Sequence, residues 1–132
     1  MTTARSGLSV LVADDSPPMR AHLRAIVNQE PGLYLAGEAD TAAAALELFF
    51  RFRPDAVLVE VCLPDRNGFE VVQCIKQVSP ECAIILLTTT PDPFVDQVGQ
   101  MLGVTAVCSK SGDLGRIREV LRELLPSQPE SK

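Results

Sequence analysis

Five short apolar runs, spaced regularly along the chain, are the feature that most restricts its fold. Most of these runs are continuous and do not alternate with polar residues, which is typical of parallel strands covered by helices on both faces. A strand with one face in water would alternate instead. The runs predict strands over residues 8–13, 33–39, 56–61, 83–88 and 105–109.

After each run, apolar residues recur at the three- and four-residue spacing of amphipathic helices. Ser16 before Pro17 and Asp92 before Pro93 each place a capping side chain ahead of a proline at the first helical position, and the pair at 40–41 offers a similar cap. Five strands that alternate with five helices predict an α/β domain of the (βα)5 type, with a doubly wound, open parallel sheet. In such a sheet the functional crevice lies at the carboxyl ends of the strands.

The length and charge of the chain narrow its class further. A chain of 132 residues fits one domain, to which we assign residues 8–125, with an N-terminal extension at 1–7 and a flexible C-terminal tail at 126–132. A net charge of -5 and the lack of a basic run argue against nucleic acid as a partner. The first apolar run is too short for a signal peptide or a membrane span, so we expect a cytoplasmic protein with no membrane partner.

The four cysteines do not suggest a metal site. Their positions form neither a CxxC pair nor the Cys/His spacing that zinc requires. We therefore expect reduced thiols that pack as small apolar side chains at Cys62, Cys74, Cys82 and Cys108.

Acidic, hydroxyl and basic side chains stand where the predicted strands end. Asp14 and Asp15 follow the first run, Glu60 and Thr88 fall at the ends of the third and fourth, and Lys110 follows the fifth. Parallel strands bring these ends to one edge, where carboxylates could hold a hard cation and the hydroxyl and ammonium could meet phosphate oxygens. The pattern indicates phosphoryl-transfer chemistry, and the simpler alternative is a solvated acidic turn with a surface lysine.

Four segments, read in order, resemble the signatures of response-regulator receiver domains: VLVADDSPPMR, VEVCLPDRNGFEVV, ILLTTT and VCSK. The resemblance covers Leu8 to Leu125 and implies the flavodoxin-like strand order 2-1-3-4-5. It also implies that an acidic pair binds magnesium and that a carboxylate at the end of the third strand accepts a phosphoryl group. A hydroxyl and a lysine would contact the phosphoryl oxygens.

The resemblance gives each strand-end residue a role when it is carried over position by position. The loop after the third strand keeps the proline and glycine of the family as Pro64 and Gly68. The implied roles are metal ligation by Asp14, Asp15 and the main-chain carbonyl of Cys62, phosphoryl contact by Thr88 and Lys110, and the phosphoacceptor position for Glu60.

Three positions depart from the family pattern. Glu60 replaces the phosphoacceptor aspartate, Val107 stands at the aromatic switch position, and Ser111 replaces a proline, so we expect a trans peptide before it. The extra methylene of Glu60 extends the side chain by roughly 1.5 Å. A misplacement of about 1 Å can cost around a hundredfold in rate. We therefore expect magnesium binding to be weak or lost, and Glu60 to bond Lys110, Thr88 or both.

The expected function is that of a two-component or phosphorelay signalling module that is degenerate at its phosphorylation site. Such a module is not an enzyme and acts through phosphorylation-independent protein contacts. Two alternatives stay open, a working receiver with a weak or non-standard acceptor and a metal-dependent phosphate-handling enzyme. Glu60 could also be a structural carboxylate paired with Lys110.

The resemblance also indicates the partner surface. It implies a histidine kinase or an output protein that binds the fourth helix, fifth strand and fifth helix, and a homodimer is compatible with the sequence. Apart from weakly bound magnesium we expect no cofactor. The candidate contact residues on this face are Phe94, Gln97, Met101, Val107 and Leu114.

Overall fold

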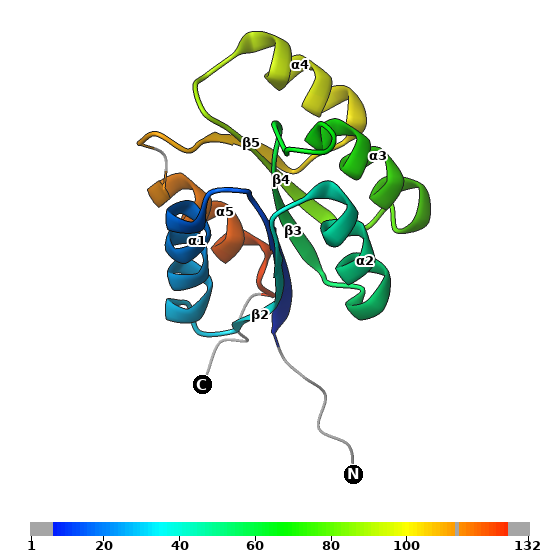
Figure 1. Ribbon diagram of the computed structural model, residues 1–132. Coiled ribbons are helices and arrows are strands. Elements are labelled where there is room, and N and C mark those ends of the chain that lie inside the picture. The colour runs from blue at the N-terminus through cyan, green and yellow to red at the C-terminus, as the bar shows by residue number, and fades with distance from the viewer. Residues whose placement is uncertain (1–6, 113, 127–132) are drawn as a thin grey trace.

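The computed structural model describes residues 7–112 and 114–126 as five strands that alternate with five helices (Figure 1). The predicted strands are confirmed to within one residue at each end. Within the described ranges, no helix has both the length and the apolar character that crossing a bilayer requires. In chain order the elements are β1 (Leu8–Ala13), α1 (Pro17–Gln29), β2 (Leu33–Ala39), α2 (Ala42–Phe52), β3 (Ala56–Glu60), α3 (Gly68–Val78), β4 (Ala83–Thr88), α4 (Pro93–Leu102), β5 (Ala106–Ser109) and α5 (Leu114–Leu124).

The sheet has the strand order β2-β1-β3-β4-β5, and all neighbouring strands are parallel. This confirms the predicted doubly wound α/β fold. Helices α1 and α5 cover one face of the sheet, whereas α2, α3 and α4 cover the other (Figure 1). The order reverses at β1, so the crevice of a doubly wound sheet is expected beside the carboxyl ends of β1 and β3.

The strands are continuous apolar runs because both of their faces are buried. Within β1, Leu11 and Ala13 belong to the core under α2, α3 and α4, whereas Val10 and Val12 belong to the core under α1 and α5. All four side chains are fully buried. Since successive side chains of a strand point to opposite faces, a polar residue in the middle of β1 would have no solvated side to occupy.

Capping hydrogen bonds fix the points where the helices begin. Ser16 Oγ accepts a hydrogen bond from the backbone N–H of Met19 at 3.3 Å, and Asp92 Oδ1 accepts one from the N–H of Phe94 at 2.9 Å. Thr41 caps α2 in the same way. These three caps confirm the predicted helix starts, and each lies at the carboxyl edge of the sheet.

The cysteines do not all pack as small apolar side chains. Cys82 and Cys108 are buried, Cys74 is half-buried and Cys62 is exposed. The prediction is wrong for Cys62 because the chain leaves the sheet after β3, which places this residue in the β3–α3 loop. Burial raises the pKa of the Cys82 thiol from 9.0 to about 11.

Cys62 is expected to react with iodoacetamide at least about tenfold faster than Cys82 in the native protein, because thiolate is the reactive form and Cys82 is both buried and poor in thiolate. Peptide mass spectrometry over a time course at mildly alkaline pH measures both rates. In concentrated urea the two rates should converge. Equal rates in the native protein would mean that the core around Cys82 opens readily.

Candidate functional site

The carboxyl ends of β1, β3 and β5 bring one lysine between two buried carboxylates. Lys110 Nζ donates hydrogen bonds to Asp14 Oδ2 at 2.9 Å and to Glu60 Oε1 at 2.6 Å. The exposed fractions of the side chains are 12% for Lys110, 0% for Asp14 and 6% for Glu60. We call these three side chains the lysine bridge. The strand ends therefore converge at one edge, as predicted.

Each of the four carboxylate oxygens in the lysine bridge accepts a hydrogen bond. Two of these bonds come from the ammonium. Glu60 Oε2 accepts from the N–H of Asp15 at 3.0 Å, and Asp14 Oδ1 accepts from the N–H of Ser16 at 2.8 Å. Arg20 donates to the carbonyl of Asp14 at 2.8 Å and holds the turn after β1. All four carboxylate oxygens therefore have a hydrogen-bond partner within the protein, and removing the ammonium would leave two of them buried without one.

The pKa values of Glu60 and Asp15 shift in opposite directions because the surroundings of the two carboxyl groups differ. Burial raises the pKa of Glu60, and its contact with Asp15 raises it further. The same contact lowers the pKa of Asp15, whose side chain is exposed. Burial alone would lower the pKa of Lys110, but its bonds to Glu60 and Asp14 outweigh burial and raise it. The lysine therefore carries a positive charge throughout the physiological range.

Asp14, Asp15 and Glu60 could hold a cation, since one carboxylate oxygen from each lies within 4.8 Å of the others. Oxygen donors suit magnesium by their chemistry. Lys110, however, already neutralises two of these three carboxylates. A metal ion would have to compete with the bound ammonium of Lys110. The carboxylate oxygens are donors of the type that magnesium prefers, but this competition weakens its binding.

The side chains of the other residues assigned to the phosphoryl site are not part of the lysine bridge, although the carbonyl of Thr88 accepts a hydrogen bond from the backbone N–H of Lys110 at 2.7 Å. Thr88 Oγ1 donates to the carbonyl of Thr90 at 3.0 Å, and within the described part of the chain no hydrogen bond joins it to Glu60. Val107 is half-buried and packs against the core under α2, α3 and α4. The peptide after Lys110 is trans, as expected. Glu60 thus bonds Lys110 but not Thr88.

Asp65 is a site residue that the sequence did not reveal. Its Oδ1 accepts from the N–H of Ala42 at 2.7 Å, and its Oδ2 accepts from the N–H of Ala43 at 3.0 Å. The hydrogen bond from the N–H of Ala42 lowers the pKa of Asp65 the most, and the bond from the N–H of Ala43 lowers it further. Asp65 thereby ties the β3–α3 loop to the start of α2. Ala42 and Ala43 lie 23 and 22 residues before Asp65 in the sequence, so no local motif predicts these hydrogen bonds.

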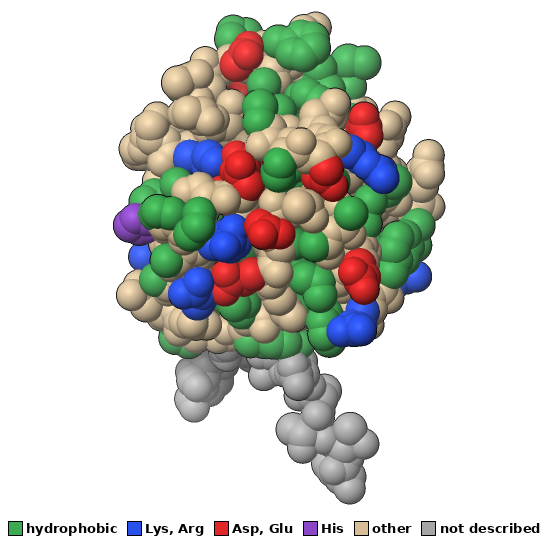
Figure 2. Space-filling view, viewed as in Figure 1, with side chains coloured by type: hydrophobic (Ala, Val, Ile, Leu, Met, Phe, Trp, Pro, Cys, Tyr) green, Lys and Arg blue, Asp and Glu red, His purple; other side chains and the backbone are tan. Residues whose placement is uncertain are grey.

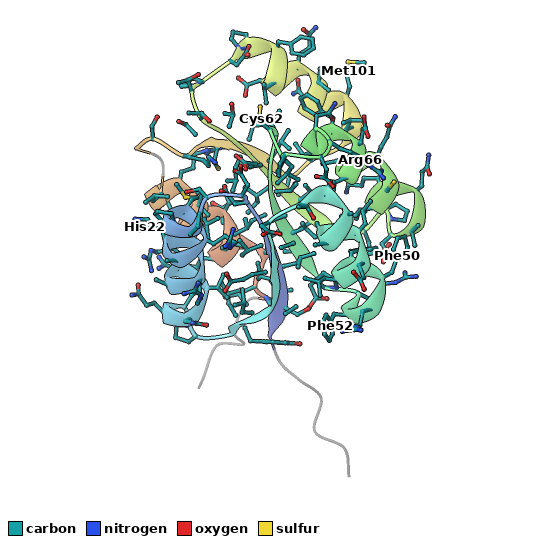
Figure 3. All side chains as sticks on the ribbon, viewed as in Figure 1. His22, Phe50, Phe52, Cys62, Arg66 and Met101 are labelled. Atoms are coloured by element: carbon teal, nitrogen blue, oxygen red, sulfur yellow. The ribbon has the colours of Figure 1, made fainter. Side chains whose placement is uncertain are left out.

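A cavity of about 340 Å³ opens beside Glu60, between the β3–α3 loop and the first turn of α4. Figure 3 places Cys62 at this end of the sheet, below α4. Phe94 is 63% exposed and belongs to the lining. The cavity is therefore an approach from solvent to Glu60. Its lining includes Glu60, Cys62, Phe69, Thr88, Asp92 and Phe94.

Comparison with known proteins finds relatives over nearly the whole chain. Sporulation initiation phosphotransferase F of Bacillus subtilis is 26% identical over 117 residues, which cover 89% of this chain and 93% of that protein. Protein-glutamate methylesterase/protein-glutamine glutaminase of Rhizobium etli is 35% identical over 81 residues, which cover 61% of this chain and 23% of that protein. This chain spans only 20% to 34% of the length of such methylesterase relatives.

A solved structure and a family model agree with the fold. The response regulator domain of Thermotoga maritima CheB superposes with a TM-score of 0.83 at 22% identity, over 93% of this chain and 99% of that domain. At this identity the likeness shows the fold alone. The family model described as the response regulator receiver domain matches residues 10–122. This chain therefore belongs to the family of response regulator receiver domains.

Proposed function

We propose that this receiver domain regulates a partner protein through contacts that do not require phosphorylation. The lysine bridge carries the proposal, because Lys110 already holds Glu60 at 2.6 Å and Asp14 at 2.9 Å. The family resemblance assigns this lysine to the oxygens of a phosphoryl group. A carboxylate of the chain itself takes that contact here, so Glu60 acts as a partial, built-in substitute with less charge and fewer oxygens than a phosphoryl group.

Glu60, at the phosphoacceptor position, is poorly placed to accept a phosphoryl group. Both of its oxygens accept hydrogen bonds, one from Lys110 and one from the N–H of Asp15. Its extra methylene moves the carboxylate by up to roughly 1.5 Å. A displacement of about 1 Å can lower a rate about a hundredfold. Phosphoryl transfer to Glu60 is therefore slow or lost.

Thr88 and Val107 support the loss of the switch. The hydroxyl of Thr88 donates to the carbonyl of Thr90 and makes no bond to Glu60 in the described structure. Val107 has an aliphatic side chain where the family carries an aromatic ring that reports phosphorylation. A domain without an acceptor and without this reporter rests in one state, so a phosphodonor has no population to shift.

Magnesium binding is weak or lost in this proposal, and no other cofactor takes part. The residues that would hold the ion are Asp14, Asp15 and the main-chain carbonyl of Cys62. A bound magnesium ion would neutralise negative charge during phosphoryl transfer. Lys110 already supplies a positive charge to Asp14 and Glu60, which removes much of the electrostatic attraction for the ion.

The partner surface that we propose is the face formed by α4, β5 and α5. Phe94 is 63% and Met101 is 80% exposed, and Figure 3 places Met101 on the outer side of α4. A hollow of about 410 Å³ lies beside α4 and is lined in part by Val107 and Arg116. A histidine kinase or an output protein with apolar side chains would fit this face, and a second copy could use it as well. The other proposed contacts are Gln97 and Leu114.

A working phosphoacceptor is the second candidate function. The cluster of Asp14, Asp15 and Glu60 favours it, because the oxygens lie close enough to hold a cation. A phosphate-handling enzyme has no comparable support, since the match to the receiver family covers residues 10–122. We therefore propose a binding module that is not itself an enzyme.

Acetyl phosphate with magnesium, followed by intact-mass spectrometry, tests the proposal. Wild-type protein is expected to gain a phosphoryl group at least about a hundredfold more slowly than Glu60→Asp, or to gain none. Glu60→Gln, which keeps the length and removes the charge, should gain none. Amide NMR with beryllofluoride should show a response across α4, β5 and α5 only in Glu60→Asp. Phosphorylation of wild type at the rate of Glu60→Asp would favour the second candidate.

A further inference from the structure

A second surface lies at the end of the domain opposite the lysine bridge. At the C-terminal ends of α2 and α3, Phe50 is 48%, Phe52 is 50% and Val78 is 43% exposed. Figure 3 shows both phenylalanines at the foot of α2, far from Cys62. We call the surface formed by Phe50, Arg51, Phe52, Arg53 and Val78 the aromatic-arginine patch.

The two arginines of the patch stack on aromatic rings. Arg51 Cζ lies 5.9 Å from the ring centroid of Phe52. Arg53 Cζ lies 5.5 Å from the centroid of Phe49 and 5.4 Å from that of Phe50. Stacking holds a guanidinium in a defined place while its N–H groups stay open to a ligand. In Figure 2, basic, acidic and apolar side chains lie side by side at the lower right, where Figure 1 has α2.

Arg51 and Arg53 make no ion pair within the described part of the chain, although Asp55 and Glu81 line a hollow together with Arg53. Arg53 Nη1 donates only a long bond of 3.5 Å to the hydroxyl of Ser79. The natural ligand of the two guanidiniums is a carboxylate, which an arginine binds through two parallel hydrogen bonds.

The backbone of Arg53 gives an independent reason to regard the patch as functional. Arg53 ends α2 in the left-handed conformation with a φ of 45°, and its N–H bonds the carbonyl of Phe49. Glycine is the residue that adopts this conformation without steric cost. An arginine kept at a strained position brings a side-chain function that glycine would lack.

We propose that the aromatic-arginine patch binds an acidic segment of a partner protein that carries aromatic or aliphatic side chains among its carboxylates. The carboxylates would pair with Arg51 and Arg53, and the apolar side chains would cover Phe50, Phe52 and Val78. Exposed arginine and aromatic residues are enriched where protein partners bind. Because the patch lies apart from α4, β5 and α5, the domain could hold two partners at once.

Titration with a short synthetic peptide in which glutamate alternates with leucine and phenylalanine tests the proposal by amide NMR. Saturable shifts are expected at residues 50–53 and 78–79. Arg51→Glu should weaken binding at least about tenfold, because it places a carboxylate against a carboxylate. Phe52→Ser should also weaken it, because it removes an apolar contact and the ring on which Arg51 stacks. Arg66→Glu is the matched control, since Arg66 is exposed in the β3–α3 loop outside the patch and makes the same charge change.

Four results would overturn the proposal. One is the absence of saturable shifts at the patch. Another is equal weakening by Arg51→Glu and Arg66→Glu, which would reduce the effect to overall charge. A third is equal or tighter binding of the charge-reversed peptide with lysine in place of glutamate. The last is a shift of the patch resonances with protein concentration alone, which would make a second copy of this chain the occupant.

Discussion

Lys110→Met is expected to lower the free energy of unfolding by about 3 to 5 kcal/mol at neutral pH. The substitution keeps an apolar stem of similar length and removes the ammonium that bridges Asp14 and Glu60. Two carboxylates with exposed fractions of 0% and 6% would then face each other without a counter-charge. Urea denaturation followed by circular dichroism measures the loss.

The pH dependence of this loss separates charge from packing. Burial already raises the pKa of Glu60 above its ordinary 4.5, and removal of Lys110 raises it further. A carboxyl group with a raised pKa in the folded state is destabilising when ionised, and the penalty disappears as the pH falls to the ordinary value. The difference between wild type and Lys110→Met should therefore shrink as the pH falls towards 4.5.

The matched control for Lys110→Met is the double variant with Glu60→Gln, which removes one of the stranded charges. It should recover part of the loss at neutral pH and depend less on pH. A loss that is the same at every pH, or that the double variant does not reduce, would contradict the charge-based account. The network would then act through packing alone.

Gly68→Ala is expected to cost about 2 to 3 kcal/mol of unfolding free energy. Gly68 is the first residue of α3, and a Cβ built there would collide with the carbonyl oxygen of Glu60. The N–H of Gly68 also bonds the carbonyl of Val61 at 2.6 Å, so the two backbones cannot separate without losing that bond. Since the colliding atom is backbone, the substitution should also displace Glu60 and weaken the lysine bridge.

Gly115→Ala is the matched control, because Gly115 lies in the first turn of α5 and a Cβ there meets nothing within 4 Å. It should raise stability by up to about 1 kcal/mol through helix propensity. Thermal and urea unfolding of both variants give the comparison, and the Lys110 side-chain resonances report on the bridge. If Gly68→Ala is as stable as Gly115→Ala, α3 moves freely and the packing argument is wrong.

The fold was predictable from the sequence because each strand is buried on both faces. Leu11 and Val12, neighbours in β1, face different cores, so both must be apolar and the run is continuous. Parallel strands then determine which ends meet, and this brought Asp14, Glu60 and Lys110 together correctly. The strand order itself came with the family resemblance and was confirmed.

The details of the site depend on loop paths and rotamers, which a pattern of residue types does not specify. Glu60 was expected to bond Lys110, Thr88 or both; it bonds Lys110, and the hydroxyl of Thr88 bonds a neighbour two residues along the chain. Arg20 and Asp65 hold the surrounding loops through backbone atoms, and a single sequence has no signal for such bonds. The exposure of Cys62 likewise follows from where the chain leaves the sheet.

The two cores on opposite faces of the sheet also set the order in which the chain can fold as it is synthesised. The core under α2, α3 and α4 is built from consecutive segments, whereas the other joins α1 to α5, as the ion pair of Glu30 with Arg122 across 92 residues illustrates. A nascent chain that ends before Leu114 lacks Ile117, Val120 and Leu121, the buried α5 side chains of this second core. Such a chain exposes an apolar sheet face on the ribosome, where it is prone to aggregation until the last helix emerges.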